Sequence, residues 1–290
     1  MSKQIPSIPI IDSHLHLWDV QRMQYPWLDA VPAIRKSFFI EDYQQAAGSF
    51  PIEKMVFVQA ECEAGMYLEE VRFVEEQALK DQRIQGIIAY APLENGTAVG
   101  PVLDALKQHP LVKGVRRMYD DAPERCVSPS FTEGLQLLPA YGYSFDISIQ
   151  PAAMEETIRM IKGSPDTQFI LDHLGKPDIR NQKWSEYQSH MERLAAFPNV
   201  VAKISGLITE ADPDNWTLEE LKPYVLHAVN CFTAERLMFG GDWPVLLLGG
   251  TYGRWITALQ EILAGLPAAD QEAIFYKNAG RIYRLDKSFE

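Results

Sequence analysis

The stretch IPIIDSH, residues 8–14, is a short β-branched run that ends in polar residues. Similar apolar runs recur along the chain, each followed by a stretch with helical periodicity, and this alternation is typical of a parallel sheet with helical crossovers. Eight such runs are the number of strands that closes a (β/α)8 barrel, which is the α/β fold we expect. The predicted strands are residues 8–14, 55–59, 86–90, 112–116, 143–149, 168–172, 200–205 and 237–241.

Between these runs the apolar residues recur every three or four positions, as one buried helix face requires. Thr217 and Glu220 have the spacing of a capping box and predict the start of a further helix. The periodicity is shortest around the third to fifth strands, so their boundaries are the least sharply defined. Two of the predicted helix faces are Leu68, Val71, Val74 and Ala78, and Trp184, Tyr187, Met191 and Leu194.

The bulk composition bounds the class of protein. The chain has 290 residues, 47% of them hydrophobic, and no linker divides it, so we expect one domain over residues 1–290. A net charge of −12 argues against a nucleic-acid partner, which would call for clustered Lys and Arg. Cys62, Cys126 and Cys231 lack the spacing of a disulfide framework or a thiolate zinc site. No apolar run reaches the roughly 18 residues of a membrane span, so we expect a cytoplasmic protein without a membrane partner.

Four polar side chains meet at one predicted edge of the sheet. In a parallel barrel the reacting groups come from the carboxyl ends of the strands and the loops that follow. The first predicted strand runs into His14 and His16, which the two-residue period of a strand puts on one face, about 6 to 7 Å apart. The sixth and eighth predicted strands run into His173 and Asp242. One such residue would usually be structural, but four at the same edge predict an active site.

The connection over residues 17–37 is long and has no clear helical period. It carries Trp18, Arg22, Tyr25 and Trp27 together with several prolines. A long βα loop of this kind lies over the mouth of a barrel. There it either walls a pocket or seals one end of the barrel with an aromatic patch.

Several motifs, taken together and in order, resemble those of the amidohydrolase superfamily. The resemblance is to its branch of lactonases, which includes fuconolactonases, rhamnonolactonases and pyrone-dicarboxylate lactonases. It covers nearly the whole chain and implies a (β/α)8 barrel of the metal-dependent-hydrolase type that opens cyclic esters. The motifs are IDSHLHLW (11–18), VRR (115–117), ILDHLGKP (170–177), KISGL (203–207), GDWP (241–244) and NA (278–279).

The chain differs from the two-metal members of the superfamily that it resembles. Those members carry a modifiable lysine on strand four and a histidine on strand five. Here those strands end in arginines and in the sequence Ser-Ile-Gln, so we do not expect a dinuclear centre. His14, His16, His173 and Asp242 could still hold one divalent ion such as zinc. Some members of the family that the chain resembles work without metal. Both a zinc-bound and a metal-free active site therefore stay open.

Opening a lactone needs a nucleophilic water, a donor for the charge on the carbonyl oxygen, and a proton for the leaving ring oxygen. We expect Asp242 to activate the water and to return the proton. Without zinc, the candidate donors to the carbonyl oxygen are His173, the His14/His16 pair and Arg116. Arg116 or Arg117 could instead grip a substrate carboxylate. Strand alternation sends these two arginines to opposite faces and leaves open which one faces the pocket.

Other residues near the predicted rim are candidates for contact with a sugar. Trp18 and Trp243 offer flat apolar faces against which sugars pack, although each could simply brace its neighbours. Gln59 and Glu61 follow the second predicted strand and could bind sugar hydroxyls or be solvated.

Lys203 lies inside a predicted strand, where an unpaired ammonium would be costly. Asp146 and Asp12 are its candidate partners, and a structural ion pair is the favoured interpretation over substrate contact.

The sequence therefore predicts a hydrolase for a small sugar lactone, such as L-fucono- or L-rhamnono-lactone. Two alternatives remain: a zinc-dependent decarboxylase of the same superfamily, and an inactive barrel that serves as a binding protein. The identity of the lactone and the oligomeric state, a homo-oligomer included, are left open.

Overall fold

The computed structural model describes residues 8–119 and 122–285, and its eight strands form one parallel sheet in the order β1 to β8. All eight predicted strands are present, and their ends differ from the predicted ends by three residues or fewer. The prediction of a (β/α)8 barrel is confirmed. The strands are β1 Ile10–Leu15, β2 Ile52–Val58, β3 Ile84–Tyr90, β4 Val112–Arg116, β5 Ser144–Ile147, β6 Phe169–Leu171, β7 Val200–Ile204 and β8 Leu237–Phe239.

The barrel closes where the segment after β8 meets the end of β1. The amide of Asp242 donates to the carbonyl of His14 over 2.7 Å, and the amide of His16 donates to the carbonyl of Trp243 over 2.8 Å. The register of β1 against β2 shifts between Asp12 and Leu15. This irregular stretch carries His14, so the closing seam of the barrel and the predicted site occupy the same place.

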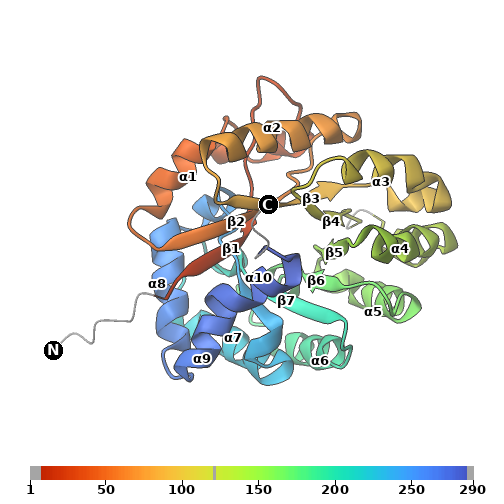
Figure 1. Cartoon of the computed structure of the whole chain (residues 1–290). Coiled ribbons are helices and arrows are strands. Elements are labelled where there is room, and N and C mark those ends of the chain that lie inside the picture. Colours follow the sequence, from red (N-terminus) through yellow and green to blue (C-terminus); the bar gives the residue numbers. More distant parts are fainter. Residues whose placement is uncertain (1–7, 120–121, 286–290) are drawn as a thin grey trace.

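Helices surround the strands and follow them along the chain (Figure 1). The predicted helix faces are buried: Val71 and Val74 on α2, and Tyr187, Met191 and Leu194 on α6. The predicted capping box begins α7, because Thr217 accepts from the amide of Glu220 while Glu220 accepts from the amide of Thr217. The helices are α1 Ile40–Ala47, α2 Tyr67–Lys80, α3 Gly100–Lys107, α4 Pro129–Tyr141, α5 Met154–Gly163, α6 Trp184–Ala195, α7 Leu218–Phe232, α8 Tyr252–Leu263, α9 Ala268–Glu272 and α10 Asn278–Tyr283.

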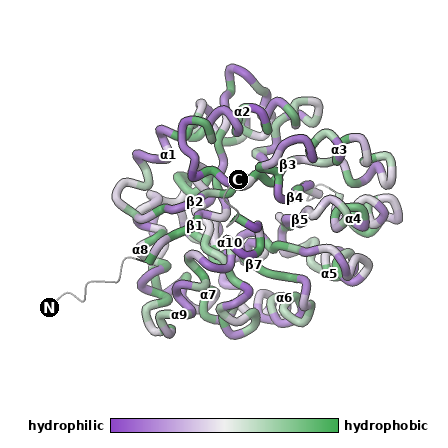
Figure 2. The backbone as a smooth tube through the Cα atoms, viewed as in Figure 1, coloured by the Kyte–Doolittle hydropathy of each residue, from purple (hydrophilic) through white to green (hydrophobic). Residues whose placement is uncertain are grey.

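The last helix, α10, covers the amino-terminal end of the barrel. The side chains of Ala279 and Tyr283 pack into the interior cluster that includes Val56 and Ile170. Just after this helix, the carbonyl of Leu285 accepts from Lys54 at the start of the sheet. Figure 2 shows hydrophobic residues along the central strands and a mixture of hydrophilic and hydrophobic residues in the surrounding helices. One end of the barrel is thus sealed, and the carboxyl ends of the strands are left as the open end.

The long connection after β1 contains two short 3₁₀ helices, Pro26–Ala30 and Pro32–Ile34. Trp18 is fully buried beneath it, with its ring centroid 5.6 Å from that of Trp27 and 5.4 Å from that of Phe38. Both predicted roles of this loop are therefore realised, because the aromatic cluster seals the rim while Trp27 faces a cavity. In residues 8–119 and 122–285, no helix has the length and apolar character needed to cross a membrane.

Candidate active site

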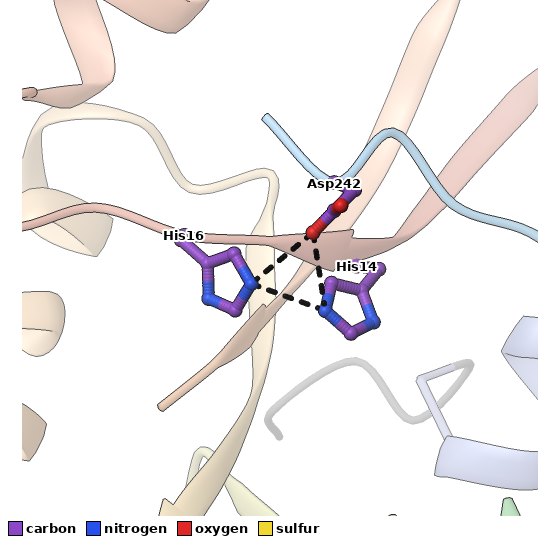
Figure 3. A group of neighbouring side chains, drawn as sticks. All are labelled: His14, His16 and Asp242. Carbon is purple, nitrogen blue, oxygen red and sulfur yellow. Dashed lines mark hydrogen bonds and ion pairs between the residues drawn. The ribbon is translucent and has the colours of Figure 1, made fainter. Parts of the chain in front are cut away.

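Three of the four predicted residues converge at the closing seam. The Nε2 atoms of His14 and His16 lie 3.1 Å apart, and Oδ1 of Asp242 lies 3.6 Å from the first and 3.4 Å from the second. Figure 3 shows the three side chains pointing toward one another, with His14 on β1, His16 just after it and Asp242 on the segment after β8. All three are buried, and Asp242 is 4% exposed. The sequence separation of more than 220 residues is bridged only by barrel closure.

The ring of His16 is oriented by the neighbouring strand. Its Nδ1 lies 2.7 Å from the carbonyl oxygen of Val58 on β2. A carbonyl can only accept, so Nδ1 carries the hydrogen, and in the neutral ring Nε2 presents its lone pair to His14 and Asp242. This is the arrangement of a histidine ready to ligate a metal, in which the second nitrogen donates to a backbone carbonyl.

The geometry of this trio fits a divalent metal ion. Zinc takes nitrogen and oxygen ligands at about 2.0 to 2.2 Å, so two ligands of a tetrahedral ion are separated by about 3.3 to 3.6 Å. The three separations here, 3.1, 3.4 and 3.6 Å, lie close to this range. The donors could therefore hold one zinc ion with little movement.

His173 lies on the adjoining side of the site. Its backbone has a positive φ of 55°, and its Nδ1 lies 2.9 Å from Oγ of Ser205 and 4.0 Å from Oδ2 of Asp242. Gly206, also at positive φ, packs against this pair. A Cβ at Gly206 would lie 2.6 Å from Nδ1 of His173 and 2.9 Å from Oδ2 of Asp242. Only glycine permits the loop after β7 to approach these two side chains so closely.

A buried ion cluster lies beneath the trio, inside the barrel. Nζ of Lys203 on β7 lies 2.6 Å from Asp146 on β5 and 3.0 Å from Asp172 at the end of β6. Asp172 in turn lies 3.2 Å from Nδ1 of His14. Tyr283 of α10 donates to Asp146 over 2.9 Å. Lys203 thus pairs with Asp146, which is one of its two predicted candidate partners, and also with Asp172, which was not predicted.

Asp12, the other candidate partner of Lys203, points out of the barrel instead. It accepts from the hydroxyls of Tyr43 and Tyr252 over 3.0 and 2.7 Å, and from the amide of Gly241 over 2.8 Å. These bonds tie α1 and α8 to the closing seam. The side chain of Ile11 packs into the barrel interior, so strand alternation turns that of Asp12 toward the helices. The irregular stretch of β1 between Asp12 and Leu15 then brings His14 to the site.

The two arginines at the end of β4 point in opposite directions, and Arg116 is the one that faces the pocket. Its guanidinium donates to the carbonyl of Gln59 and lies 3.4 Å from Asp172, while its Nε is buried without a hydrogen-bond partner among the described residues. Arg117 turns outward and forms a bidentate pair with Glu94, at 3.0 and 2.7 Å. Strand alternation separates the two, and the barrel decides which one turns inward.

A cavity of about 390 Å³ opens at the carboxyl end of the barrel, a size suited to a small molecule. His16, Arg116, His173 and Asp242 lie in its wall. The polar rim consists of Glu61, Ser148, Lys176, Thr209 and Glu210, and the apolar part of Trp27, Ala60, Met118 and Val245.

Comparison with known proteins now identifies the family. A family model described as amidohydrolase matches residues 11–285. The chain belongs to the amidohydrolase family. It is 31% identical, over 96% of its length and 99% of the relative, to the uncharacterized protein y4mH of Sinorhizobium fredii. It is 27% identical, over 96% of both chains, to an L-fucono-1,5-lactonase of Burkholderia ambifaria.

A solved amidohydrolase structure shares the same architecture. The structure of an amidohydrolase from Burkholderia multivorans with bound zinc superposes on this chain with a TM-score of 0.86 at 25% identity. The match covers 95% of this chain and 99% of that one. The predicted family resemblance is therefore confirmed, and this chain is a hydrolase of the amidohydrolase family.

In this amidohydrolase, five residues predicted to bind substrate lie behind the cavity wall or beside it. Trp18, Gln59 and Lys203 are fully buried, Trp243 packs against Phe38 and Tyr43, and Arg117 pairs with Glu94. Among the described residues that line the cavity, none of these five occurs. Proximity in sequence to a strand end does not determine which way a side chain points, because the β1 irregularity and the loops reorient it.

The rim of the amidohydrolase and the buried cluster beneath it also contain residues that were not predicted from the sequence. Asp172 lies within the recognised motif ILDHLGKP, as does Lys176, so the motif carried a signal for both. Glu210 belongs to no motif and follows the short 3₁₀ helix Leu207–Thr209. Trp27 was part of the aromatic loop, but only the folded loop shows that it faces the cavity.

The protonation states follow from burial and charge. Burial alone would raise the pKa of Asp242, but His173, His16 and His14 hold it well below its usual range. Burial lowers the pKa of His173 to about 4 despite the nearby Asp242 and Asp172 carboxylates. Burial likewise lowers the pKa of His14 well below its ordinary value, in spite of Asp172. At neutral pH Asp242 is therefore an ionised carboxylate, and the rings of His14 and His173 are neutral.

Proposed function

We propose that this amidohydrolase opens the ring of a small sugar lactone by hydrolysis, with Asp242 as the general base. The observation that carries the proposal is the placement of Asp242, an ionised carboxylate beside the imidazoles of His14, His16 and His173, in the wall of a cavity of about 390 Å³. Its two oxygens face different neighbours, with Oδ1 toward His14 and His16 and Oδ2 toward His173. An acceptor held in this way can orient a water for attack.

The first step is proton transfer from water to Asp242 as the water oxygen attacks the lactone carbonyl. Negative charge then develops on the carbonyl oxygen and needs donors. Arg116 is suited to this task, because its buried Nε hydrogen has no partner among the described residues and the side chain lies in the cavity wall. A well-placed donor in a dry site lowers the barrier by roughly 3 kcal/mol.

In the second step the bond between the carbonyl carbon and the ring oxygen breaks, and the ring oxygen leaves as an alkoxide. Asp242 returns the proton it took from water to this oxygen, which yields a hydroxy acid. A single carboxylate suffices because the two proton transfers occur in sequence.

A zinc ion bound by His14, His16 and Asp242, with His173 nearby, would lower the pKa of a coordinated water and polarise the carbonyl. The separations of the three ligand atoms support this cofactor. The zinc bound in the related Burkholderia multivorans structure supports it as well.

The sugar character of the substrate is supported by the L-fucono-1,5-lactonase relative, which matches this chain over 96% of both lengths. It is also supported by the rim, where carboxylates, hydroxyls and an ammonium accompany the indole of Trp27. We propose an aldonolactone such as L-fucono- or L-rhamnono-lactone as the substrate.

A panel of aldonolactones, assayed by acid release with a pH indicator, tests this function. We expect at least one aldonolactone to be hydrolysed by the native enzyme, with and without added zinc or chelator, and the Asp242→Asn variant to be inactive. Release of carbon dioxide from aromatic carboxylates, with no acid release from any lactone, would instead indicate a decarboxylase. Full activity of the folded Asp242→Asn variant would refute the assignment of the base.

A further inference from the structure

Two carboxylates of the cavity wall flank the catalytic centre. Glu61 lies three residues beyond the end of β2, and Glu210 follows the short 3₁₀ helix after β7. His14 lies on β1, His16 directly follows it and Asp242 follows β8, and the sheet closes between β8 and β1. The strand order β7, β8, β1, β2 therefore puts one carboxylate on each side of the centre. Both side chains line the cavity.

Glu61 is held in place at a cost to its backbone. Its φ is +55°, a left-handed conformation that costs a residue with a side chain on the order of 1 kcal/mol or more. The fully buried side chain of Gln59 accepts from the amide of Glu61 over 2.6 Å and donates to its carboxylate. Strain that is maintained in this way at a cavity wall indicates a side chain whose direction matters.

Gln59 also joins Glu61 to Arg116. The backbone carbonyl of Gln59 accepts from the guanidinium of Arg116, while its side chain holds Glu61. The donor for the carbonyl oxygen and one flanking carboxylate thus share a single buried residue. Arg116 and Glu61 both line the cavity, so a ligand that meets Arg116 with its carbonyl shares that cavity with the Glu61 carboxylate.

Backbone hydrogen bonds hold the loop around Glu210, while the Glu210 carboxylate lies in the cavity wall. Its carbonyl accepts from the amide of Arg180 over 3.1 Å, and the preceding Thr209 bonds the carbonyl of Gly206 over 2.7 Å. No hydrogen bond or ion pair reaches the Glu210 carboxylate from the residues that the structure describes. Burial raises the pKa of this carboxyl, with an opposing effect of Lys176. This half-buried carboxylate in the cavity wall therefore has acceptor capacity that a ligand can use.

The polar groups of this wall together specify a ligand. The Nε of Arg116 is buried and lacks an acceptor among the described residues. The Glu61 carboxylate already accepts from Gln59 but, like that of Glu210, lines the cavity and can accept further hydrogen bonds. A ring with one carbonyl and hydroxyls on both sides of it supplies this set. A lactone that carries carboxylates would meet like charge on both sides.

We propose that Glu61 and Glu210 are the residues that select a neutral, polyhydroxylated lactone by accepting from its ring hydroxyls, and that Gln59 positions Glu61. The inference rests on the proposed function and deepens it. A carboxylate that accepts from a hydroxyl forms a charge-assisted bond, and a substrate that lacks the hydroxyl leaves the carboxylate desolvated and unpaired.

Kinetics with two lactones of equal ring size test this proposal. One is the best aldono-1,5-lactone of the panel, and the other is δ-valerolactone, which has no hydroxyls. In the variants Glu61→Gln, Glu210→Gln and Gln59→Met, we expect kcat/KM for the sugar lactone to fall roughly 10- to 100-fold. For δ-valerolactone we expect a change within about 2-fold, which also shows that the variants are folded. Glu63→Gln, an exposed position on the same loop, is the matched control and should change neither value.

Binding of unreactive lactams separates this proposal from the proposed function. Calorimetry compares the lactam of the same sugar with δ-valerolactam, in the native enzyme and in the three variants. If the native enzyme hydrolyses no lactone but binds the sugar lactam more tightly, and the variants lose that preference, the function is wrong and the selecting residues are right. The assignment of Glu61 and Glu210 is refuted if lactones are hydrolysed but the variants lower kcat/KM equally for the sugar lactone and δ-valerolactone. It is also refuted if the variants change kcat/KM for neither substrate.

Discussion

Replacing Lys203 by methionine removes the cation of the buried cluster beneath the cavity. In the native protein its Nζ lies 2.6 Å from Asp146 and 3.0 Å from Asp172, and all three side chains are fully buried. The two aspartates would then face each other in the barrel interior without a counter-ion. Removing one partner of such a buried pair costs about 3 to 5 kcal/mol.

The size of this loss sets the expected shift in melting temperature. A chain of this length loses roughly 2 °C for each kcal/mol, so Lys203→Met should melt about 5 to 10 °C below the native protein at pH 7.5. The double variant Asp146→Asn/Lys203→Met removes one charge of each sign and leaves Asp172 with Arg116. It should recover much of the loss.

The dependence on pH has a defined sign. Burial already raises the pKa of Asp146 to about 6 in the native protein, although Lys203 opposes this effect. Without Lys203, the pKa of Asp146 rises further, and Asp172 loses the cation that holds its pKa low. Carboxyls raised in this way favour the folded state when protonated, so the deficit of Lys203→Met is largest above these raised values and shrinks as the pH falls toward 5. Thermal unfolding at pH 5, 6.5 and 8 measures it. A single variant as stable as the native protein at pH 8, or a double variant no better than the single, would refute the reasoning.

Four further outcomes are expected. Asp242→Asn should lower kcat/KM for the best lactone at least about 100-fold with an unchanged circular dichroism spectrum, because the general base is lost. Gly206→Ala should lower activity by a similar factor, since its Cβ would lie 2.6 Å from Nδ1 of His173 and displace the site; wild-type activity would contradict this geometry. Zinc at about 100 times its Kd should stabilise the native protein by about 2.7 kcal/mol in chemical unfolding. The same zinc should not stabilise His16→Gln, and equal stabilisation of both proteins would place the ion elsewhere. Nuclear magnetic resonance of the histidine rings should show His173 titrating near pH 4, because burial lowers its pKa to about 4; a midpoint for His173 near the ordinary histidine value would contradict the burial argument.

The central part of the site was open to prediction from the sequence. Period-two geometry put His14 and His16 together, and parallel strands all end at one edge, so His173 and Asp242 had to reach the same rim. Lys203 was expected to need a buried carboxylate, and Asp146 provides it. These inferences needed only the strand positions and the cost of an unpaired charge.

The walls of the cavity were not open to prediction in the same way. Trp18 and Trp243 follow strand ends that carry site residues, yet they pack away from the cavity, and Trp27 faces it instead. Gln59 is buried and holds Glu61 rather than lining the cavity. Glu210 lies in a loop without a motif, so nothing in the local pattern marked it.

What the sequence by itself determined is the class of architecture and the residues at the strand ends, because hydrophobic periodicity is local and parallel strands share one direction. Only the tertiary structure decided which of Arg116 and Arg117 turns inward, how His14 approaches Asp242, and which side chains wall the cavity. These features depend on the register of the closing seam and on loop conformations. Both are set by contacts between residues far apart in the chain, which no local pattern encodes.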